Sequence, residues 1–159
     1  MTYYVTGFMY STDKKRVVLI KKINPEWQRG HLNGVGGKIE QGETPEVAMS
    51  REFEEETGVG TTPEAWKAFA VINGGQEYKV YFLYTIDDNL TQAKTVEAEK
   101  VGIYAVDDLP RNVLHNLRWL IPMSLDSKLS FEHPIEIEEK ELEEGHMRSK
   151  TAGKSPAIR

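Results

Sequence analysis

The sequence predicts an α+β fold in a single domain. Two groups of β-like segments, at residues 2–22 and 66–106, are separated by a helical segment rich in carboxylates, and a second helical segment follows at 113–125. Strands that come in runs between helices are typical of α+β proteins. At 159 residues the chain has the length of one domain and can bury a core of its own.

The first segments predict two strands and a loop. Residues 2–10 are aromatic and β-branched with loose alternation, and residues 16–22 are almost continuously apolar, as in a strand buried on both faces. The second strand ends in Lys21 and Lys22, and such a pair is typical of a solvated strand end. Residues 23–36 are rich in Asn, Pro and Gly, so we expect a loop there.

The next segment is a helix whose two ends are marked in the sequence. Thr44 can cap it, and Pro45 suits its first turn. Gly58 suits the left-handed conformation at which many helices end. The residues predicted for its buried face are Val47, Ala48 and Phe53.

Three carboxylates on this helix, Glu52, Glu55 and Glu56, stand at positions i, i+3 and i+4. That spacing puts them on one face, where like charges destabilise a helix by about 0.2–0.5 kcal/mol per pair. Hard oxygen ligands of this kind suit Mg²⁺ or Mn²⁺, which proteins share with water and substrate phosphates. The repulsion is explained if a cation normally sits there, although a run of acids is by itself more often a solvated helix face.

The segments after this helix predict a hairpin, a loop and one more strand. Residues 66–72 and 77–86 predict strands joined by a tight turn at residues 73–76, whose sequence is Asn-Gly-Gly-Gln. A polar loop is expected at 87–99, followed by a strand at 101–106.

The C-terminal part predicts a helix, an edge strand and a tail. Residues 113–125 have the pattern of an amphipathic helix that bends or ends near its proline, with Trp119 in the core. Residues 131–137 predict a strand that their proline confines to a sheet edge. We therefore expect a folded domain at residues 1–135 and a charged tail, disordered by itself, at 136–159.

Composition excludes several classes of function. The net charge of −5 disfavours broad attraction to nucleic acids or anionic membranes. The chain has no cysteine, and hence no disulfide, thiolate nucleophile or cysteine zinc site. No apolar run approaches the length of about 18 residues that a membrane span needs, and the N-terminus is not signal-like. A soluble, cytoplasmic protein is expected.

The stretch GKIEQGETPEVAMSREFEEETGV, residues 37–59, resembles the Nudix box of MutT-type pyrophosphohydrolases. It has Gly, five residues, Glu, seven residues, and then Arg-Glu-apolar-x-Glu-Glu-x-Gly-apolar. The one mild departure is Phe53, where a branched aliphatic residue is commoner. A solvated acidic face would not need these residue types at fixed offsets. The resemblance covers about residues 2–125 and implies the Nudix α/β/α sandwich, with a mixed sheet between helices.

The resemblance also implies a metal site. Glu52, Glu55 and Glu56 would hold Mg²⁺, with Mn²⁺ as an alternative, and a backbone carbonyl of the glycine pair that ends in Gly37 would join the metal shell. Bound divalent ions would offset the phosphate charge, act as Lewis acids and lower the pKa of a bound water.

Two further pairs of residues acquire roles from the resemblance. Arg51 would pair with Glu43, the first glutamate of the box, and hold the loop against the helix. Relatives often take one more carboxylate from the late acidic loop as a metal ligand or general base, and Glu97 and Glu99 are the candidates here.

Candidate phosphate ligands are basic. MutT-type enzymes commonly use a basic residue at the end of the second strand, which makes Lys21 and Lys22 candidates, and the pattern does not choose between them. Lys38 faces either phosphate or water.

Candidate base ligands are aromatic or carry amides. Trp27 is either a core residue or a platform for a base. Asn33 can pair with a purine edge, as a similarly placed Asn does in 8-oxo-purine hydrolases, or it can serve as a turn residue. His115 and Asn116, near the start of the last helix, are candidates because polar side chains there reach the base in MutT-type enzymes.

The expected activity is metal-dependent cleavage of the diphosphate linkage of a nucleoside diphosphate derivative. We expect a nucleoside or deoxynucleoside triphosphate, more specifically a purine or oxidised purine, to give the monophosphate and pyrophosphate. ADP-ribose hydrolases of this superfamily usually add an N-terminal dimerisation segment, whereas this sequence starts directly at its first strand.

Three alternatives remain: an ADP-ribose hydrolase, a dinucleoside polyphosphate hydrolase and a non-catalytic nucleotide-sensing Nudix module. The residues of the box recognise only the diphosphate, so they do not distinguish among these possible substrates. Sensing modules often lose the box acids, which are all present here. The expected partner is a nucleotide small molecule, without membrane or stable nucleic-acid binding, and the protein is expected to be a monomer or homodimer.

Overall fold

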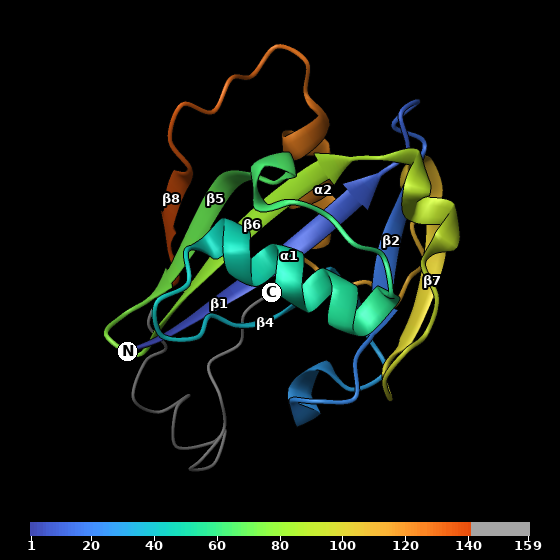
Figure 1. The fold of residues 1–159 in the computed structure, drawn as a ribbon. Coiled ribbons are helices and arrows are strands. Elements are labelled where there is room, and N and C mark those ends of the chain that lie inside the picture. The colour runs from blue at the N-terminus through green and yellow to red at the C-terminus, as the bar shows by residue number, and fades with distance from the viewer. Residues whose placement is uncertain (141–159) are drawn as a thin grey trace.

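A mixed β-sheet lies between two helices in the computed structural model, which describes residues 1–140 (Figure 1). The prediction of an α+β fold with a mixed sheet between helices is confirmed. The strands are β1 (Thr2–Tyr10), β2 (Arg16–Lys21), β3 (Leu32–Asn33), β4 (Val35–Lys38), β5 (Lys67–Gly74), β6 (Tyr78–Ile86), β7 (Lys100–Ala105) and β8 (Ile135–Glu138). The helices are α1 (Pro45–Thr57) and α2 (Leu117–Leu125), and short 3-10 helices lie at Glu26–Gln28, Pro63–Ala65, Asp88–Gln92 and Val106–Asp108.

The strands follow the order β3-β2-β1-β6-β5-β8, with β4 paired to β1 and β7 paired to β2. β1 and β6 run parallel over their whole length, from Thr2 beside Tyr78 to Tyr10 beside Ile86. β5 and β8 are also parallel, and the other pairs are antiparallel. The first strand is therefore central and carries neighbours on both sides.

Alternation along β1 builds two cores. Val5 and Met9 pack in the cluster that contains Phe53 of α1. Phe8 and Tyr10 pack in the cluster that contains Leu117 of α2. Because successive side chains of a strand point to opposite faces, the two helices must cover opposite faces of the sheet. Within residues 1–140, no helix is long and apolar enough to cross a membrane.

Helix α1 begins and ends where the sequence indicates. The Thr44 hydroxyl accepts a hydrogen bond from the Val47 N–H at 3.2 Å, and Gly58 ends the helix at φ +78°. Ala48 and Phe53 are fully buried as predicted, but Val47 is 40 % exposed, so its predicted burial is wrong. Met49 is buried instead, because it packs on β1, where a Cβ added at Gly7 would lie 2.5 Å from its sulfur.

Two short strands, β3 and β4, lie in and just after the segment predicted as a loop at 23–36. The reason is close packing of the backbone: a Cβ added at Gly36 would lie only 1.9 Å from the Val5 carbonyl oxygen. Glycine has low strand propensity in general, but here its missing side chain lets β4 pair with β1. Strand propensity therefore does not predict this pairing.

The second helix begins four residues later than predicted, at Leu117 instead of 113. The preceding residues bond to the segment of β3: Leu32 donates to the Asn112 carbonyl and Leu114 donates to the Leu32 carbonyl, both at 2.9 Å. Trp119 is 39 % exposed, so its predicted place in the core is wrong. The helix continues past its proline to Leu125.

Other boundaries shift by a few residues. Strand β5 extends to Gly74, so the hairpin turn lies at residues 75–77 instead of 73–76. The predicted edge strand at 131–137 is present as β8, at Ile135–Glu138. The charged tail predicted at 136–159 falls mostly outside the described residues.

Candidate functional site

A cavity of about 530 Å³ opens between the starts of β1 and β6, the loop at residues 22–28 and the start of α2. Its polar lining includes Lys22, Asn33 and Asn116, and its aromatic lining includes Trp27 and Tyr78. Four substrate-binding candidates from the sequence thus meet at one place. A smaller cavity of about 320 Å³ lies near Tyr3 and Tyr81 and contains none of these residues.

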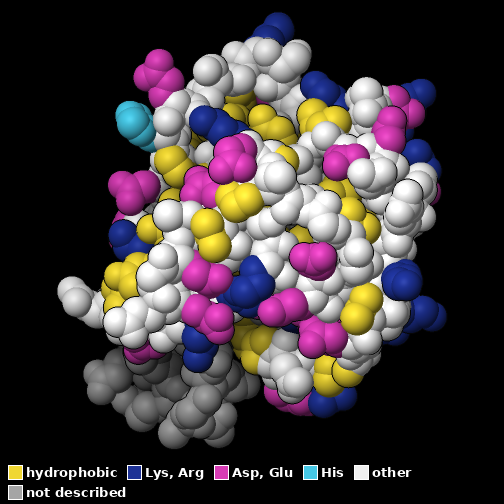
Figure 2. All heavy atoms as spheres, viewed as in Figure 1, with side chains coloured by type: hydrophobic (Ala, Val, Ile, Leu, Met, Phe, Trp, Pro, Cys, Tyr) yellow, Lys and Arg dark blue, Asp and Glu magenta, His cyan; other side chains and the backbone are white. Residues whose placement is uncertain are grey.

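The acidic face of α1 reaches this cavity at Gly37, which lines it. A Cβ added at Gly37 would lie 2.4 Å from Oε1 of Glu52, so the carboxylate packs directly on the glycine backbone. Figure 2 shows acidic side chains gathered around a basic one on the face that carries α1. The box glycine therefore joins the helix carboxylates to the cavity.

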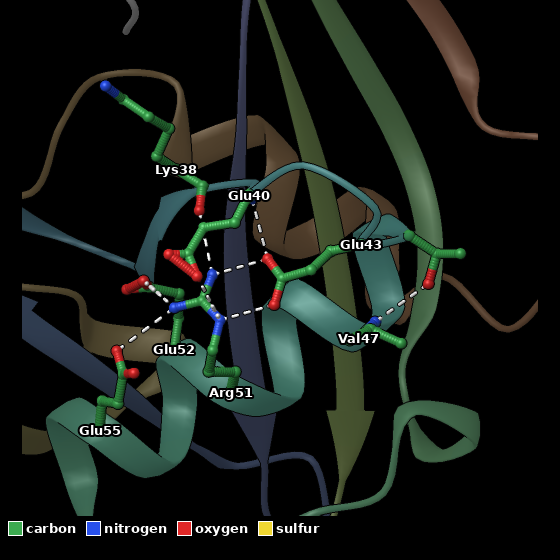
Figure 3. Close-up of polar contacts among 8 residues, drawn as sticks. Lys38, Glu40, Glu43, Val47, Arg51, Glu52 and Glu55 are labelled. Atoms are coloured by element: carbon green, nitrogen blue, oxygen red, sulfur yellow. Dashed lines mark hydrogen bonds and ion pairs between the residues drawn. The ribbon is translucent and has the colours of Figure 1, made fainter.

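Arg51 lies at the centre of a network of carboxylates (Figure 3). It donates to both oxygens of Glu43, from Nε at 2.6 Å and from Nη2 at 2.8 Å, and Nη2 also donates to the Lys38 carbonyl at 3.1 Å. Its Nη1 donates to Glu52 at 2.9 Å and to Glu55 at 3.3 Å. The arginine thus fastens the loop before α1 to the helix, as the box resemblance implies.

These contacts shift two pKa values. The hydrogen bonds from Arg51 lower the pKa of Glu43, so this carboxylate stays ionised. Burial raises the pKa of Glu52, and its hydrogen bond to Arg51 opposes that effect. The arginine therefore offsets the effect of burial on the pKa of Glu43 completely, and on the pKa of Glu52 only in part.

Glu56 is a half-buried carboxylate that receives no hydrogen bond from Arg51. Its Oε2 is buried and has no hydrogen-bond partner among the described residues. Burial raises its pKa to about 8; Lys22 opposes this, and Glu52, Glu99 and Glu97 add to it by repulsion. A carboxylate with a buried, unpartnered oxygen among other carboxylates is costly to ionise, and a bound cation would offset that cost.

The types of side chain at this site are suitable ligands for a divalent cation. Glu52, Glu55 and Glu56 offer only hard oxygen ligands, which Mg²⁺ and Mn²⁺ prefer. Among residues 1–140, no three acidic or histidine side chains already converge as metal ligands. Arg51 explains this, because it draws Glu52 and Glu55 toward its own guanidinium. Glu55 is half exposed and has room to turn.

The two late carboxylates differ in their contacts. Glu99 accepts three hydrogen bonds, from Lys22 Nζ at 3.0 Å, from the Ile23 N–H at 2.6 Å and from the Asn24 N–H at 3.2 Å. Burial raises its pKa, but these donors outweigh burial and the net shift is downward. Glu97 is exposed. Glu99 therefore fixes the loop that carries Lys22 into the cavity.

The amides of the cavity also differ. Asn33 Nδ2 donates to Gln28 Oε1 at 3.1 Å, and its Oδ1 accepts from the Gly34 N–H at 2.7 Å, so both ends of this amide are used. Asn33 lies in β3 opposite Ile20, so its interpretation as a turn residue is wrong. Asn116 is 2 % exposed, and its Oδ1 has no hydrogen-bond partner among the described residues. Of the two amides, Asn116 keeps an acceptor for a ligand.

Three basic or polar candidates lie outside the cavity lining. Lys21, Lys38 and His115 are exposed and do not line it. The pattern left Lys21 and Lys22 undecided, and the structure places only Lys22 at the cavity. Sequence reasoning did not single out Tyr78, although the strand predicted at 77–86 and its alternation put that side chain on one defined face.

The contacts of Arg51 predict energetic coupling to Glu43. In a double-mutant cycle with Arg51→Gln and Glu43→Gln, the double variant should lose less stability than the sum of the single variants, by about 1–2 kcal/mol. Urea unfolding of the wild type and the three variants measures the free energies of this cycle. Glu40 supplies the control, because it is mostly exposed and lies 3.7 Å from Arg51 Nε. A Glu40→Gln cycle should be nearly additive. Strict additivity of the Glu43 cycle would contradict the coupling.

The sequence model of the NUDIX domain family matches residues 2–122 of this chain. No curated protein matches the chain. A structure from a study of MutT from Aliivibrio salmonicida and Vibrio cholerae is similar at 26 % identity and TM-score 0.56, over 70 % of this chain and 87 % of the other.

Two further structures share the fold. The MutT protein of Bacillus halodurans has a TM-score of 0.61 at 17 % identity, over 80 % of this chain and 84 % of the other. A MutT/nudix family protein of Enterococcus faecalis has a TM-score of 0.54 at 16 % identity, over 65 % of this chain and 43 % of the other.

Proposed function

This chain belongs to the Nudix family, and from that membership we propose that it is a metal-dependent nucleotide pyrophosphohydrolase. Nudix enzymes hydrolyse phosphoric anhydrides, act on nucleoside diphosphate derivatives and generally use divalent metal ions. The proposed substrate is a nucleoside or deoxynucleoside triphosphate with a purine base, oxidised purines included. The products are the monophosphate and pyrophosphate. The enzyme acts on a small molecule in the cytoplasm, as a monomer or homodimer.

The observation that carries this proposal is the contact between Glu52 and Gly37. It puts the acidic face of α1 at the edge of the cavity that Lys22 and Asn116 also line. A nucleotide needs such an arrangement: carboxylates and a cation for the diphosphate, a basic residue for phosphate, and a partly apolar pocket for the base. These groups come from separate parts of the chain.

The residues that would hold Mg²⁺, or Mn²⁺, are Glu52, Glu55 and Glu56, with the carbonyl of Gly37. When bound, the ion would offset phosphate charge and lower the pKa of a coordinated water. The unpartnered Oε2 of Glu56 supports this assignment.

The chain's own residues supply positioning and proton transfer. Lys22, held by Glu99, would orient a phosphate at the cavity. The two oxygens of Glu99 already accept three hydrogen bonds, which favours Glu97 or a carboxylate of the box as the base that takes the proton of the attacking water. Arg51 and Glu43 would hold the loop at Gly37 in place.

The base would bind in the inner part of the cavity. Trp27, Tyr78 and Phe82 provide ring surface for stacking or packing. The free acceptor of Asn116 suits a base that presents an N–H donor there. Asn33, whose amide already bonds to Gln28 and Gly34, would support this wall.

Asn116→Ala should raise KM for the preferred purine nucleotide about 5- to 100-fold, because a bound base would lose a buried hydrogen bond worth about 1–3 kcal/mol. The value of kcat should change little, since the amide lies away from the diphosphate. Steady-state kinetics on a purine and a pyrimidine triphosphate measure it.

Asn33→Ala is the matched comparison for this experiment. If Asn33 contacts the base, its replacement should lower activity on the purine nucleotide alone. Equal loss of activity on both nucleotides would limit Asn33 to a structural role in the cavity wall. An unchanged KM in Asn116→Ala would contradict the assignment of the base pocket.

A phosphate-release screen with Mg²⁺ tests the proposed function itself. The panel contains ordinary and oxidised nucleoside triphosphates, ADP-ribose and dinucleoside polyphosphates, and products are identified by mass. Preference for a purine triphosphate with release of pyrophosphate supports the proposal. Preference for ADP-ribose or a dinucleoside polyphosphate would replace the substrate, and binding without turnover would indicate a sensing module.

A further inference from the structure

The last strand of the described chain lies beside one wall of the cavity. β8 pairs with β5 up to Asn73 beside Glu138. Beyond it, the Glu139 N–H donates to the Asn73 carbonyl at 2.9 Å, and the Asn73 side chain donates to Glu138. The segment from 135 to 139 is therefore fastened to the end of β5 that leads into the hairpin of β5 and β6 (Figure 1).

Tyr78, the first residue of β6, connects this segment to the cavity. It lines the cavity, is only 4 % exposed, and its hydroxyl donates to Oε1 of Glu139. Burial and the neighbouring carboxylate raise the pKa of the Tyr78 phenol, so it stays protonated and remains the donor. The cavity wall is thus bonded to a residue far away in the sequence.

The ring of Tyr78 is also fixed from the opposite strand. Gly74 is its cross-strand partner, and a Cβ at Gly74 would lie 2.0 Å from Cζ of the ring. The ring lies across the glycine backbone and can keep this position only because Gly74 has no side chain. Two contacts, one at the ring face and one at the hydroxyl, fix the position of the Tyr78 ring and with it this wall of the cavity.

We propose that Glu139 is a positioning residue for the substrate cavity, which it shapes by holding Tyr78 through its hydroxyl. This inference rests on the proposed function, because it assigns the cavity to the nucleotide. Glu139 does not line the cavity and would not touch the substrate; it acts through the tyrosine. Its effect therefore falls on binding of the base and not on the carboxylates of α1.

The test compares Tyr78→Phe, Glu139→Ala and Glu139→Gln, with the full chain and its preferred triphosphate. Tyr78→Phe removes one oxygen and keeps the ring. It and Glu139→Ala should each raise KM about 3- to 10-fold, the range expected from the loss of one ordinary hydrogen bond that affects the substrate only through the tyrosine. In both, kcat should stay within about twofold. Glu139→Gln keeps an acceptor oxygen and should restore most of the binding.

Glu136→Ala is the matched control, because Glu136 is an exposed carboxylate on the same strand, paired in register with Val71. It should leave KM unchanged. The double variant Tyr78→Phe/Glu139→Ala should be no worse than either single variant, since both remove the same bond. Amide NMR spectra of the nucleotide-free variants give a second readout: Glu139→Ala should shift the signals of Glu77 and Val80, which line the cavity.

The outcomes separate the inference from the function on which it rests. A hydrolase whose Glu139→Ala and Tyr78→Phe variants keep the wild-type KM would overturn the positioning role alone. So would a fall in kcat at unchanged KM, or independent, additive effects of the two substitutions. A wild-type protein that neither binds nor cleaves any nucleotide of the panel would overturn the proposed function, and the positioning role with it.

Discussion

Glu56→Gln is expected to lower kcat by at least about 10²-fold at saturating Mg²⁺, while the fold is preserved. Glutamine has the shape of glutamate but no charge, so the substitution removes a proposed ligand charge without creating a cavity. Glu56 is the suitable target because its Oε2 has no protein partner among the described residues. Glu55→Gln is expected to act in the same direction.

Stability measurements make this prediction sharper. Mg²⁺ should raise the Tm of the wild-type protein, since a ligand that binds only the native state stabilises it. That increase should be smaller in Glu56→Gln. Without metal, the variant should be no less stable than the wild type, because burial raises the pKa of Glu56 to about 8 and so already disfavours its ionised form.

Glu54→Gln is the matched control, on the same helix but with an exposed side chain. It should keep both turnover and the effect of Mg²⁺ on Tm. Turnover near the wild-type value in Glu56→Gln at saturating Mg²⁺ would rule out Glu56 as a metal ligand.

Local rules predicted the elements whose causes are local. Thr44 and Gly58 mark the ends of α1 because a cap and a left-handed residue act within one turn of the helix. The ion pair of Glu43 and Arg51, which the resemblance to the Nudix box implied, is also present. Helix periodicity did not predict the exposure of Val47, because neighbouring elements decide which face of a helix is covered.

These local rules could not predict contacts between segments that lie far apart in the sequence. Asn116 is buried at the cavity because the chain brings the start of α2 against β3, a strand formed some 80 residues earlier, as the bond of Leu114 to Leu32 shows. The same holds for Glu99, which meets the loop after β2, and for Tyr78, which meets Glu139. Residue types indicated candidates for the site, but only tertiary structure selects among them.

Replacing the two adjacent glycines of β4, Gly36 and Gly37, with alanine is expected to have two different effects. At Gly36 the new Cβ would lie 1.9 Å from the Val5 carbonyl oxygen, which belongs to the central strand and cannot move without breaking the pairing of β1 and β4. Gly36→Ala should therefore destabilise the protein by at least about 3 kcal/mol, at the upper end of the usual cost of overpacking. Urea unfolding measures the loss.

At Gly37 the new Cβ would lie 2.4 and 2.5 Å from the two carboxylate oxygens of Glu52, which end a flexible side chain. The carboxylate can swing away, so Gly37→Ala should cost less than about 1 kcal/mol of stability while kcat falls at least about tenfold, because a proposed metal ligand is displaced. Loss of stability at Gly36 and loss of turnover at Gly37 would be separate effects one residue apart. If Gly37→Ala keeps full turnover, the contact of Glu52 with this glycine has no part in catalysis, and the metal site must be held elsewhere on α1.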